Sequence, residues 1–211
     1  MGRYINADVT VDTGQGFIGC NMFAYCINNP TNHYDPEGTD AVWIQENNTV
    51  PFAGHTGLLV EDEKTGKWYF FYWGMDSEAI SFTNVLNALI GTKAKLVWKE
   101  INADDFDLTT TDGVVNALKQ SNDSDVDRSE KVTDTIYLQG DFSKTIEYIE
   151  NLIEKTPEYN LLTSNCVQHS RNALQYSNSS FIYADSVIPN VAYLKVKFIS
   201  FVRDVFSAIF H

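Results

Sequence analysis

Cysteine and positive charge are both scarce in this chain. Only three of its 211 residues are cysteine, and 15 lysines and arginines stand against 28 aspartates and glutamates, for a net charge of −13. Three cysteines are too few for a disulfide framework, although a single Cys20–Cys26 bridge stays open. The shortage of basic residues argues against nucleic acid as a partner and against charge-driven binding to an anionic membrane, because both need a basic surface.

Long uncharged hydrophobic runs are also missing. No apolar segment follows the first residues, so we expect no secretory signal, and no stretch is suited to crossing a bilayer. The most apolar part, residues 187–210, is interrupted by charged side chains. Its apolar residues recur at helical spacing, which predicts an amphipathic helix packed on the domain in preference to one on a membrane surface. The predicted face consists of Phe198, Phe201, Val202, Val205 and Ile209.

Hydrophobic residues are plentiful by comparison. They make up 44% of the chain, and aromatic residues 13%, which is enough for a packed core. Sequence patterns predict five strands, two helices and a further helix that starts at Cys166. We expect the strands at 41–44, 55–60, 68–73, 94–99 and 135–138, and the first two helices at 78–89 and 143–155. This order lacks βαβ alternation and a Gly-rich nucleotide loop, so it indicates the α+β class.

Residues 104–134 are polar and acidic, and residues 121–125 (Ser-Asn-Asp-Ser-Asp) are their least apolar part. We expect most of this segment to be a solvated insertion or a mobile lid, with a helical turn at 114–118. Its carboxylates lack the spacing of a calcium loop, which also needs a glycine and a closing glutamate. We therefore predict no metal site, and we predict no cofactor.

One cysteine stands where a helix is predicted to begin. Residues 159–162 are extended and half apolar, 163–165 form a polar corner, and helical spacing starts at Cys166. Asn165 is a good N-cap, because its side-chain oxygen can accept a backbone N–H of the first turn. Unpaired N–H groups and the helix dipole favour a thiolate there, which is the nucleophilic form of cysteine. The alternative is a buried structural cysteine.

A histidine far upstream could take the proton of such a thiol. His55 opens a predicted strand, and a histidine at a strand edge facing a helix N-terminus can act first as base and then as acid. His169 is a second candidate, but it follows Cys166 by three positions, so its side chain leans along the same helix. His33 in the N-terminal segment and His211 at the end of the chain are weaker candidates, and a cysteine without any catalytic base also stays open.

The first 38 residues differ from the rest in their short strands and turns. They carry Asn-Met-Phe-Ala-Tyr at 21–25, Asn-Asn-Pro at 28–30 and Asp-Pro-x-Gly at 35–38. This segment resembles the end of an RHS repeat-associated core, the β shell of bacterial polymorphic toxins. The resemblance implies a core remnant at 1–40 and a toxin domain at 41–211, secreted or delivered into a target cell as part of a larger RHS protein. Asp35 would either support self-cleavage or shape a turn.

A second resemblance covers roughly residues 41–176. A strand that begins Gly-His-Thr at 54–56 and a later Tyr-Asn-Leu-Leu-x-x-Asn-Cys at 159–166 resemble the circularly permuted papain-like fold. That family includes cell-wall peptidases, deubiquitinating-type peptidases and acyltransferases. The resemblance implies an antiparallel sheet packed against helices, with Cys166 as the nucleophile and His55 as the base and acid.

The same resemblance implies an orienting residue on the strand after the histidine strand. Residues 68–73 offer only Tyr69 or Tyr72 there. The oxyanion would be bound by the N–H of Cys166, with Asn165 or Gln168 as side-chain donors.

The implied activity is that of a peptidase, an amidase or an acyltransferase, acting on a protein, a peptidoglycan peptide or a lipid. An immunity protein would be a further partner. One alternative is a non-catalytic binding module whose partner surface is the aromatic run 68–73 and the apolar C-terminal helix. Another is a lipid acyl hydrolase or acyltransferase, suggested by that apolar C-terminal stretch.

Overall fold

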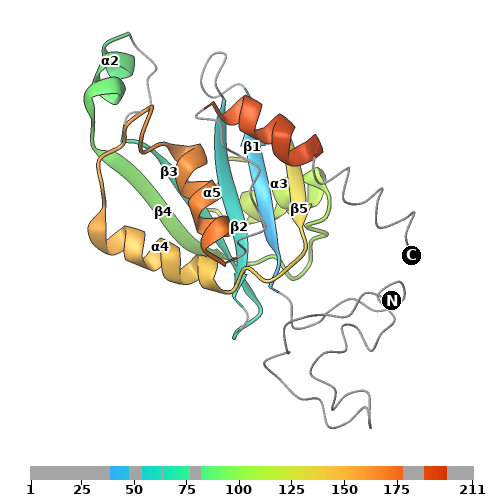
Figure 1. Ribbon diagram of the computed structural model, residues 1–211. Helices are drawn as coiled ribbons and strands as arrows, with labels where there is room; N and C mark the ends of the chain where they lie inside the picture. The colour runs from blue at the N-terminus through green and yellow to red at the C-terminus, as the bar shows by residue number, and fades with distance from the viewer. Residues whose placement is uncertain (1–38, 48–53, 63, 77–81, 178–187, 199–211) are drawn as a thin grey trace, which may run out of the picture.

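The computed structural model describes residues 39–47, 54–62, 64–76, 82–177 and 188–198. They form a five-stranded antiparallel sheet in the order β4-β3-β2-β1-β5, with helices against it (Figure 1). The strands are β1 (Ala41–Glu46), β2 (His55–Asp62), β3 (Lys67–Met75), β4 (Ala94–Ile101) and β5 (Asp134–Leu138). The helices are α2 (Phe82–Ile90), α3 (Thr111–Gln120), α4 (Lys144–Lys155) and α5 (Cys166–Ser177), and residues 189–198 are also helical. The predicted α+β class, an antiparallel sheet packed against helices, is confirmed.

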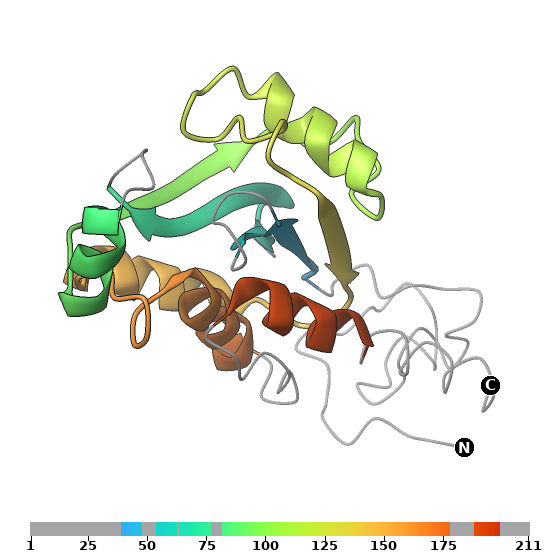
Figure 2. The same cartoon turned by 90° about the horizontal axis from the view of Figure 1, so that it is seen from above.

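The sheet is the middle layer of three, with α3 on one face and α4, α5 and the helix at 189–198 on the other (Figure 2). Successive strand residues point to opposite faces, so β2 sends Leu58 to the α5 face and Leu59 to the α3 face. β3 divides in the same way, with Phe70 on the α3 face and Phe71 and Trp73 on the α5 face. These aromatic side chains are fully buried, so the centre of the aromatic run is core and offers no partner surface.

Residues 104–134 combine exposed and packed parts: many of them are exposed, as expected of a solvated insertion, but α3 and its apolar neighbours pack on one face of the sheet. α3 contains the predicted helical turn, and the Thr110 hydroxyl caps it by accepting the N–H of Gly113 at 3.1 Å. Apolar residues three and four positions apart cover the sheet, while the charged residues that dominate the composition face outward. The buried members of this layer are Leu108, Val114, Ala117, Leu118 and Val126.

The sheet opens at one end, between β2 and β3. These strands pair only as far as Gly57 on β2, whereas β3 goes on pairing with β4 to its last residue. His55 and Thr56 therefore pair with β1 alone. On β3, the side-chain indole N–H of Trp73 donates to the carbonyl of Ser164 at 3.2 Å, and Ser164 lies just before α5. The start of α5 consequently lies beside the opening.

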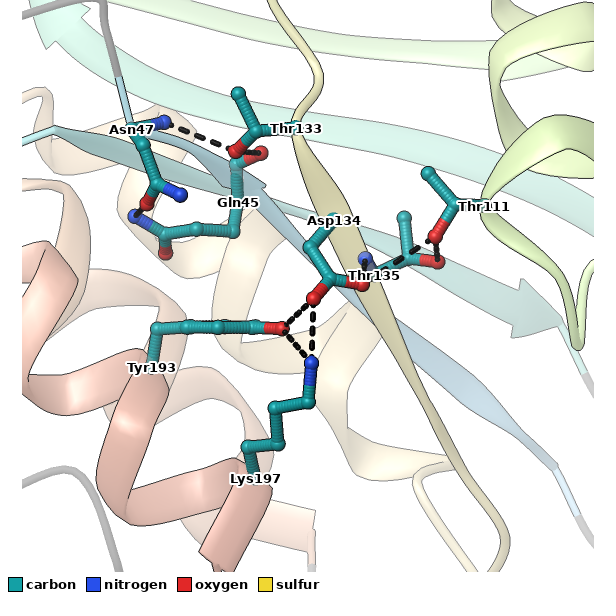
Figure 3. Close-up of polar contacts among 8 residues, drawn as sticks. All are labelled: Gln45, Asn47, Thr111, Thr133, Asp134, Thr135, Tyr193 and Lys197. Atoms are coloured by element: carbon teal, nitrogen blue, oxygen red, sulfur yellow. Dashed lines mark hydrogen bonds and ion pairs between the residues drawn. The ribbon is translucent and has the colours of Figure 1, made fainter.

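Two groups of polar contacts fasten the helix at 189–198 to the sheet. The buried Gln45 of β1 donates its amide N–H to Asn190 at 2.8 Å. At the start of β5, Asp134 accepts hydrogen bonds from the Tyr193 hydroxyl and from Lys197, the latter at 2.6 Å (Figure 3). Both groups connect residues far apart in the sequence, so this helix is part of the domain.

Only Phe198 of the predicted packed face lies within the described residues. Ala192, Tyr193 and Val196 are buried, whereas Phe198 is 66% exposed, so its expected burial is wrong. The other four residues of the predicted face lie outside the described residues. Within the described ranges, no helix is both long and apolar enough to cross a bilayer.

The predicted RHS remnant lies almost entirely outside the described residues, as do Asp35, His33, His211 and the Cys20–Cys26 pair. The first described residues already belong to the packed fold. Thr39 is buried, and its hydroxyl accepts the N–H of Phe142 at 2.8 Å.

Candidate active site

The start of α5 is held by reciprocal side-chain caps. The side-chain oxygen of Asn165 accepts the N–H of Gln168 at 3.0 Å, and that of Gln168 accepts the N–H of Asn165 at 3.2 Å. This capping box includes the N-cap predicted for Asn165 and fixes the polar corner to the first helical turn. The two amide nitrogens donate to the carbonyls of Leu161 at 2.7 Å and Leu162 at 3.1 Å. Both predicted oxyanion donors are therefore engaged in holding the corner.

His169 also stabilises this corner. Its two ring nitrogens lie 3.0 Å from the Ser164 hydroxyl and 3.1 Å from the Tyr148 hydroxyl, and its ring centre is 4.5 Å from that of Trp73. Burial lowers the pKa of His169 to about 4, so the ring is neutral near pH 7. With both nitrogens bonded to hydroxyls, His169 has a structural role in this geometry and is a poor candidate for the base.

Cys166 is the first residue of α5, and its sulfur lies against β2. The side chain is only 2% exposed, and the backbone N–H groups of Thr56, Val167 and Cys166 lower the pKa of the thiol. Burial outweighs these donors and raises the pKa of the Cys166 thiol to about 12. The expected thiolate is therefore not the resting form, because a helix dipole contributes less than the loss of solvation of a fully buried sulfur. The resting thiol is protonated.

His55 is buried at the same end of β2. Its ring stacks on Tyr72 of β3, with the ring centres 4.3 Å apart and the planes at 29°. Among the described residues its Nε2 has no hydrogen-bond partner, and burial lowers the pKa of His55 to about 4. The ring is thus a neutral base near pH 7. A buried nitrogen without a partner is costly to a fold, which is a reason to look for a functional role.

The two tyrosines predicted as orienting candidates are separated by the alternation of β3. Tyr72 lies on the α3 face and stacks on His55, whereas Tyr69 stacks on Trp98, with ring centres 5.0 Å apart. Of the two, the structure places Tyr72 against the histidine.

Cys166 and His55 lie on opposite faces of the sheet. Cys166 packs in the core of the α5 face, and His55 stacks on a residue of the α3 face. At this position β2 pairs with β1 and not with β3, and the backbone N–H of Thr56, the residue after His55, contributes to lowering the pKa of the thiol. The Glu46 carboxylate raises the pKa of both groups, although burial has the larger effect on each. The sulfur and the imidazole therefore share one electrostatic environment.

A buried ion pair completes this environment. Arg128 donates to both carboxylate oxygens of Glu46 at 2.5 Å, and its guanidinium carbon lies 4.3 Å from the centre of the Tyr72 ring. Sequence reasoning missed both charged residues. The signal for Arg128 was an arginine within an acidic segment, and Glu46 gave none, because it follows the predicted strand 41–44. Among the described residues, no three potential ligands cluster as a metal site would need.

Comparison with known proteins gives one informative match. No protein-family model matches the chain. A search of curated proteins also finds no significant match. The fold is similar to that of the crystal structure of a type VI secretion system effector, TseH, with a TM-score of 0.50 and 10% sequence identity over 76% of this chain and 89% of that chain. At this identity the likeness concerns the fold.

Proposed function

We propose that this chain is a bacterial effector domain that performs cysteine-dependent acyl transfer, as a peptidase, an amidase or an acyltransferase. Cys166 is the nucleophile and His55 is the base and acid. The observation that supports this most is the place of Cys166, buried as the first residue of a helix capped by Asn165 and Gln168, with the backbone N–H of Thr56, next to His55, contributing to lowering the thiol pKa. A cysteine at a helix start beside a neutral histidine is an arrangement suited to nucleophilic catalysis.

The chemistry follows from these two groups. Neutral His55 accepts the thiol proton as the Cys166 sulfur attacks a substrate carbonyl carbon. The imidazolium then gives that proton to the leaving amine or alcohol as the carbon–heteroatom bond breaks, which leaves an acyl thioester on Cys166. Water, or a second acceptor in the case of a transferase, releases the acyl group. The N–H of Cys166, in the first helical turn, would bind the oxyanion.

Substrate access to this site would require a rearrangement. Cys166 and His55 are 2% and 4% exposed, so a substrate carbonyl reaches the sulfur only after side chains around the opening move apart. Opening would also hydrate the sulfur and bring its pKa down from about 12, which makes proton transfer to His55 easier.

The similarity to a type VI effector supports delivery into a target cell as the setting of this activity. It agrees with the resemblances to an RHS toxin and to the permuted papain-like fold, in which a histidine strand precedes a cysteine helix. We propose a protein or a peptidoglycan peptide as the substrate class and an immunity protein as a partner.

Growth inhibition tests the function. Wild type and Cys166→Ala would be expressed in bacterial cells, directed either to the cytosol or to the periplasm. We expect Cys166→Ala to lose growth inhibition and Ser170→Ala, a matched change on the buried face of the same helix, to retain it. Equal thermal melting of the variants would exclude a folding defect. Equal toxicity of Cys166→Ala and wild type would remove the catalytic proposal.

One feature favours a second candidate, a non-catalytic binding module. The helix at 189–198 carries exposed apolar side chains at 191, 194 and 198, on the face away from the sheet. Full toxicity of both Cys166→Ala and His55→Gln would favour this candidate over the enzyme.

A further inference from the structure

The ion pair between Arg128 and Glu46 is buried and geometrically specific. Both guanidinium contacts are 2.5 Å long, and the two side chains are 13% and 3% exposed. A bidentate, buried contact fixes the orientation of the planar guanidinium, which an exposed lysine pair does not do. The pair also has a defined place, because Glu46 of β1 stands opposite His55 in the register with β2.

The backbone around Arg128 is fixed independently of the ion pair. Val126, two residues earlier, is buried in the α3-face core, and its carbonyl accepts the Arg128 N–H at 2.7 Å. The Arg128 carbonyl in turn accepts the N–H of Lys131 at 2.8 Å. The segment then joins β1, where the N–H of Thr133 donates to the carbonyl of Gln45 at 2.8 Å. Arg128 is thus held from both sides within the segment 104–134.

A stack connects this arginine to the histidine. The guanidinium carbon of Arg128 lies 4.3 Å from the Tyr72 ring centre, and the His55 ring centre lies 4.3 Å from that same centre. A guanidinium over an aromatic ring is a favourable contact that restricts the ring, and a ring restricted in this way restricts its neighbour. Arg128 therefore limits the orientations open to His55 without touching the sulfur.

His55 needs such support because hydrogen bonding does not supply it at Nε2. That nitrogen is buried and has no partner among the described residues. A catalytic imidazole must be oriented to accept the thiol proton, usually by a polar group bonded to its other nitrogen. In this site, the His55 ring stacks on Tyr72, whose own ring lies against the Arg128 guanidinium.

We infer that Arg128 is a positioning residue for His55 and acts through Tyr72, so that an Arg128–Tyr72–His55 stack anchored on Glu46 orients the imidazole. This inference rests on the proposed function, because it assigns the stack to the orientation of that site's base. It also gives the segment 104–134 a role in the site, since that segment supplies the arginine.

Ring-current shifts test the stack without any catalysis. Histidine ring proton resonances would be recorded by NMR in a Cys166→Ala background, with His55→Gln to assign the signal. The Tyr72 ring should shield the His55 protons. We expect Tyr72→Leu to remove the shielding, Tyr72→Phe to keep it, and Arg128→Lys to reduce it, because lysine keeps a cation beside Glu46 but not the flat fork. An unchanged His55 signal in Arg128→Lys and Tyr72→Leu would overturn the inference.

Acylation of Cys166 by p-nitrophenyl acetate tests the link to the reaction in the chain with its cysteine intact. Misplacing a catalytic group slows a reaction steeply, so we expect Tyr72→Leu and Arg128→Lys to be at least about tenfold slower than wild type. The control is Tyr137→Leu, a half-buried tyrosine on the same face of the sheet that is bonded to Asp40. It should react at the wild-type rate.

The NMR and acylation experiments together distinguish failure of the proposed function from failure of the positioning role. If wild-type Cys166 is not acylated at all, the proposed function fails and the positioning role falls with it, whatever the NMR signals show. If wild type and Tyr72→Leu react equally fast, the function stands and the positioning role is contradicted.

Discussion

Arg128→Gln should lower the free energy of unfolding by about 3–5 kcal/mol, the usual cost of removing one partner of a buried ion pair. The Glu46 side chain is 3% exposed and receives two hydrogen bonds from Arg128 at 2.5 Å. Without the guanidinium its buried charge loses this cation and the two hydrogen bonds from it. Glutamine keeps a hydrogen-bonding group but supplies no charge. Urea unfolding at pH 7, followed by circular dichroism, would measure the change.

Two further variants control this prediction. The double variant Glu46→Gln/Arg128→Gln should recover most of the lost free energy, because replacing both charges leaves no uncompensated ion. Lys67→Gln removes an exposed pair with Glu100, at 2.8 Å and about half exposed on each side, and should leave the midpoint nearly unchanged. A loss below about 1 kcal/mol in Arg128→Gln would show that water reaches Glu46 and that the pair is not buried in solution.

Mild acid should destabilise the fold through two histidines. Burial lowers the pKa of both His55 and His169 from 6.5 to about 4. The unfolded chain therefore binds more protons between these values, so stability is full above pH 6.5 and is lost as the pH falls through about 4. For His55 this amounts to about 2 kcal/mol between pH 7 and pH 5. The less deeply buried His169 should add somewhat less.

Urea unfolding at pH 7 and pH 5 would measure this loss in wild type and in His55→Gln/His169→Gln. The double variant is less stable at pH 7 but should show a much smaller difference between the two pH values, because glutamine does not titrate. An equal difference in both proteins would mean that carboxylates, and not these buried imidazoles, cause the acid sensitivity.

The local parts of this fold follow from sequence patterns. Five strands and the helices α4 and α5 lie where alternation, helical spacing and Asn165 predicted them. α3 was predicted only as a short turn, since Val114, Ala117 and Leu118 are diluted by acidic neighbours. Packing against the sheet, which composition does not reveal, decides whether such a segment is ordered.

The candidate site also depends on burial and long-range packing, which local sequence patterns do not reveal. Sequence spacing singled out Cys166 and His55, and the structure buries both, Cys166 on the α5 face and His55 against Tyr72 of the α3 face. Sequence spacing could not show that burial of the Cys166 sulfur would raise its pKa more than the helix dipole lowers it, because burial depends on the whole fold. Sequence spacing also could not identify the ion pair of Glu46 and Arg128. These residues are 82 positions apart and meet only because the segment 104–134 covers the α3 face.

The central claim is that His55 activates Cys166 for acyl transfer. Its most direct test is the rate at which an activated ester, p-nitrophenyl acetate, acylates Cys166, followed by intact mass and by mapping of the acylated peptide. Removing a general base costs about 10²–10⁴-fold, so wild type should acquire the acyl group on Cys166 at least about 100-fold faster than His55→Gln, and Cys166→Ala should acquire none at that peptide. Equal rates in wild type and His55→Gln, or acylation of other residues only, would contradict the claim.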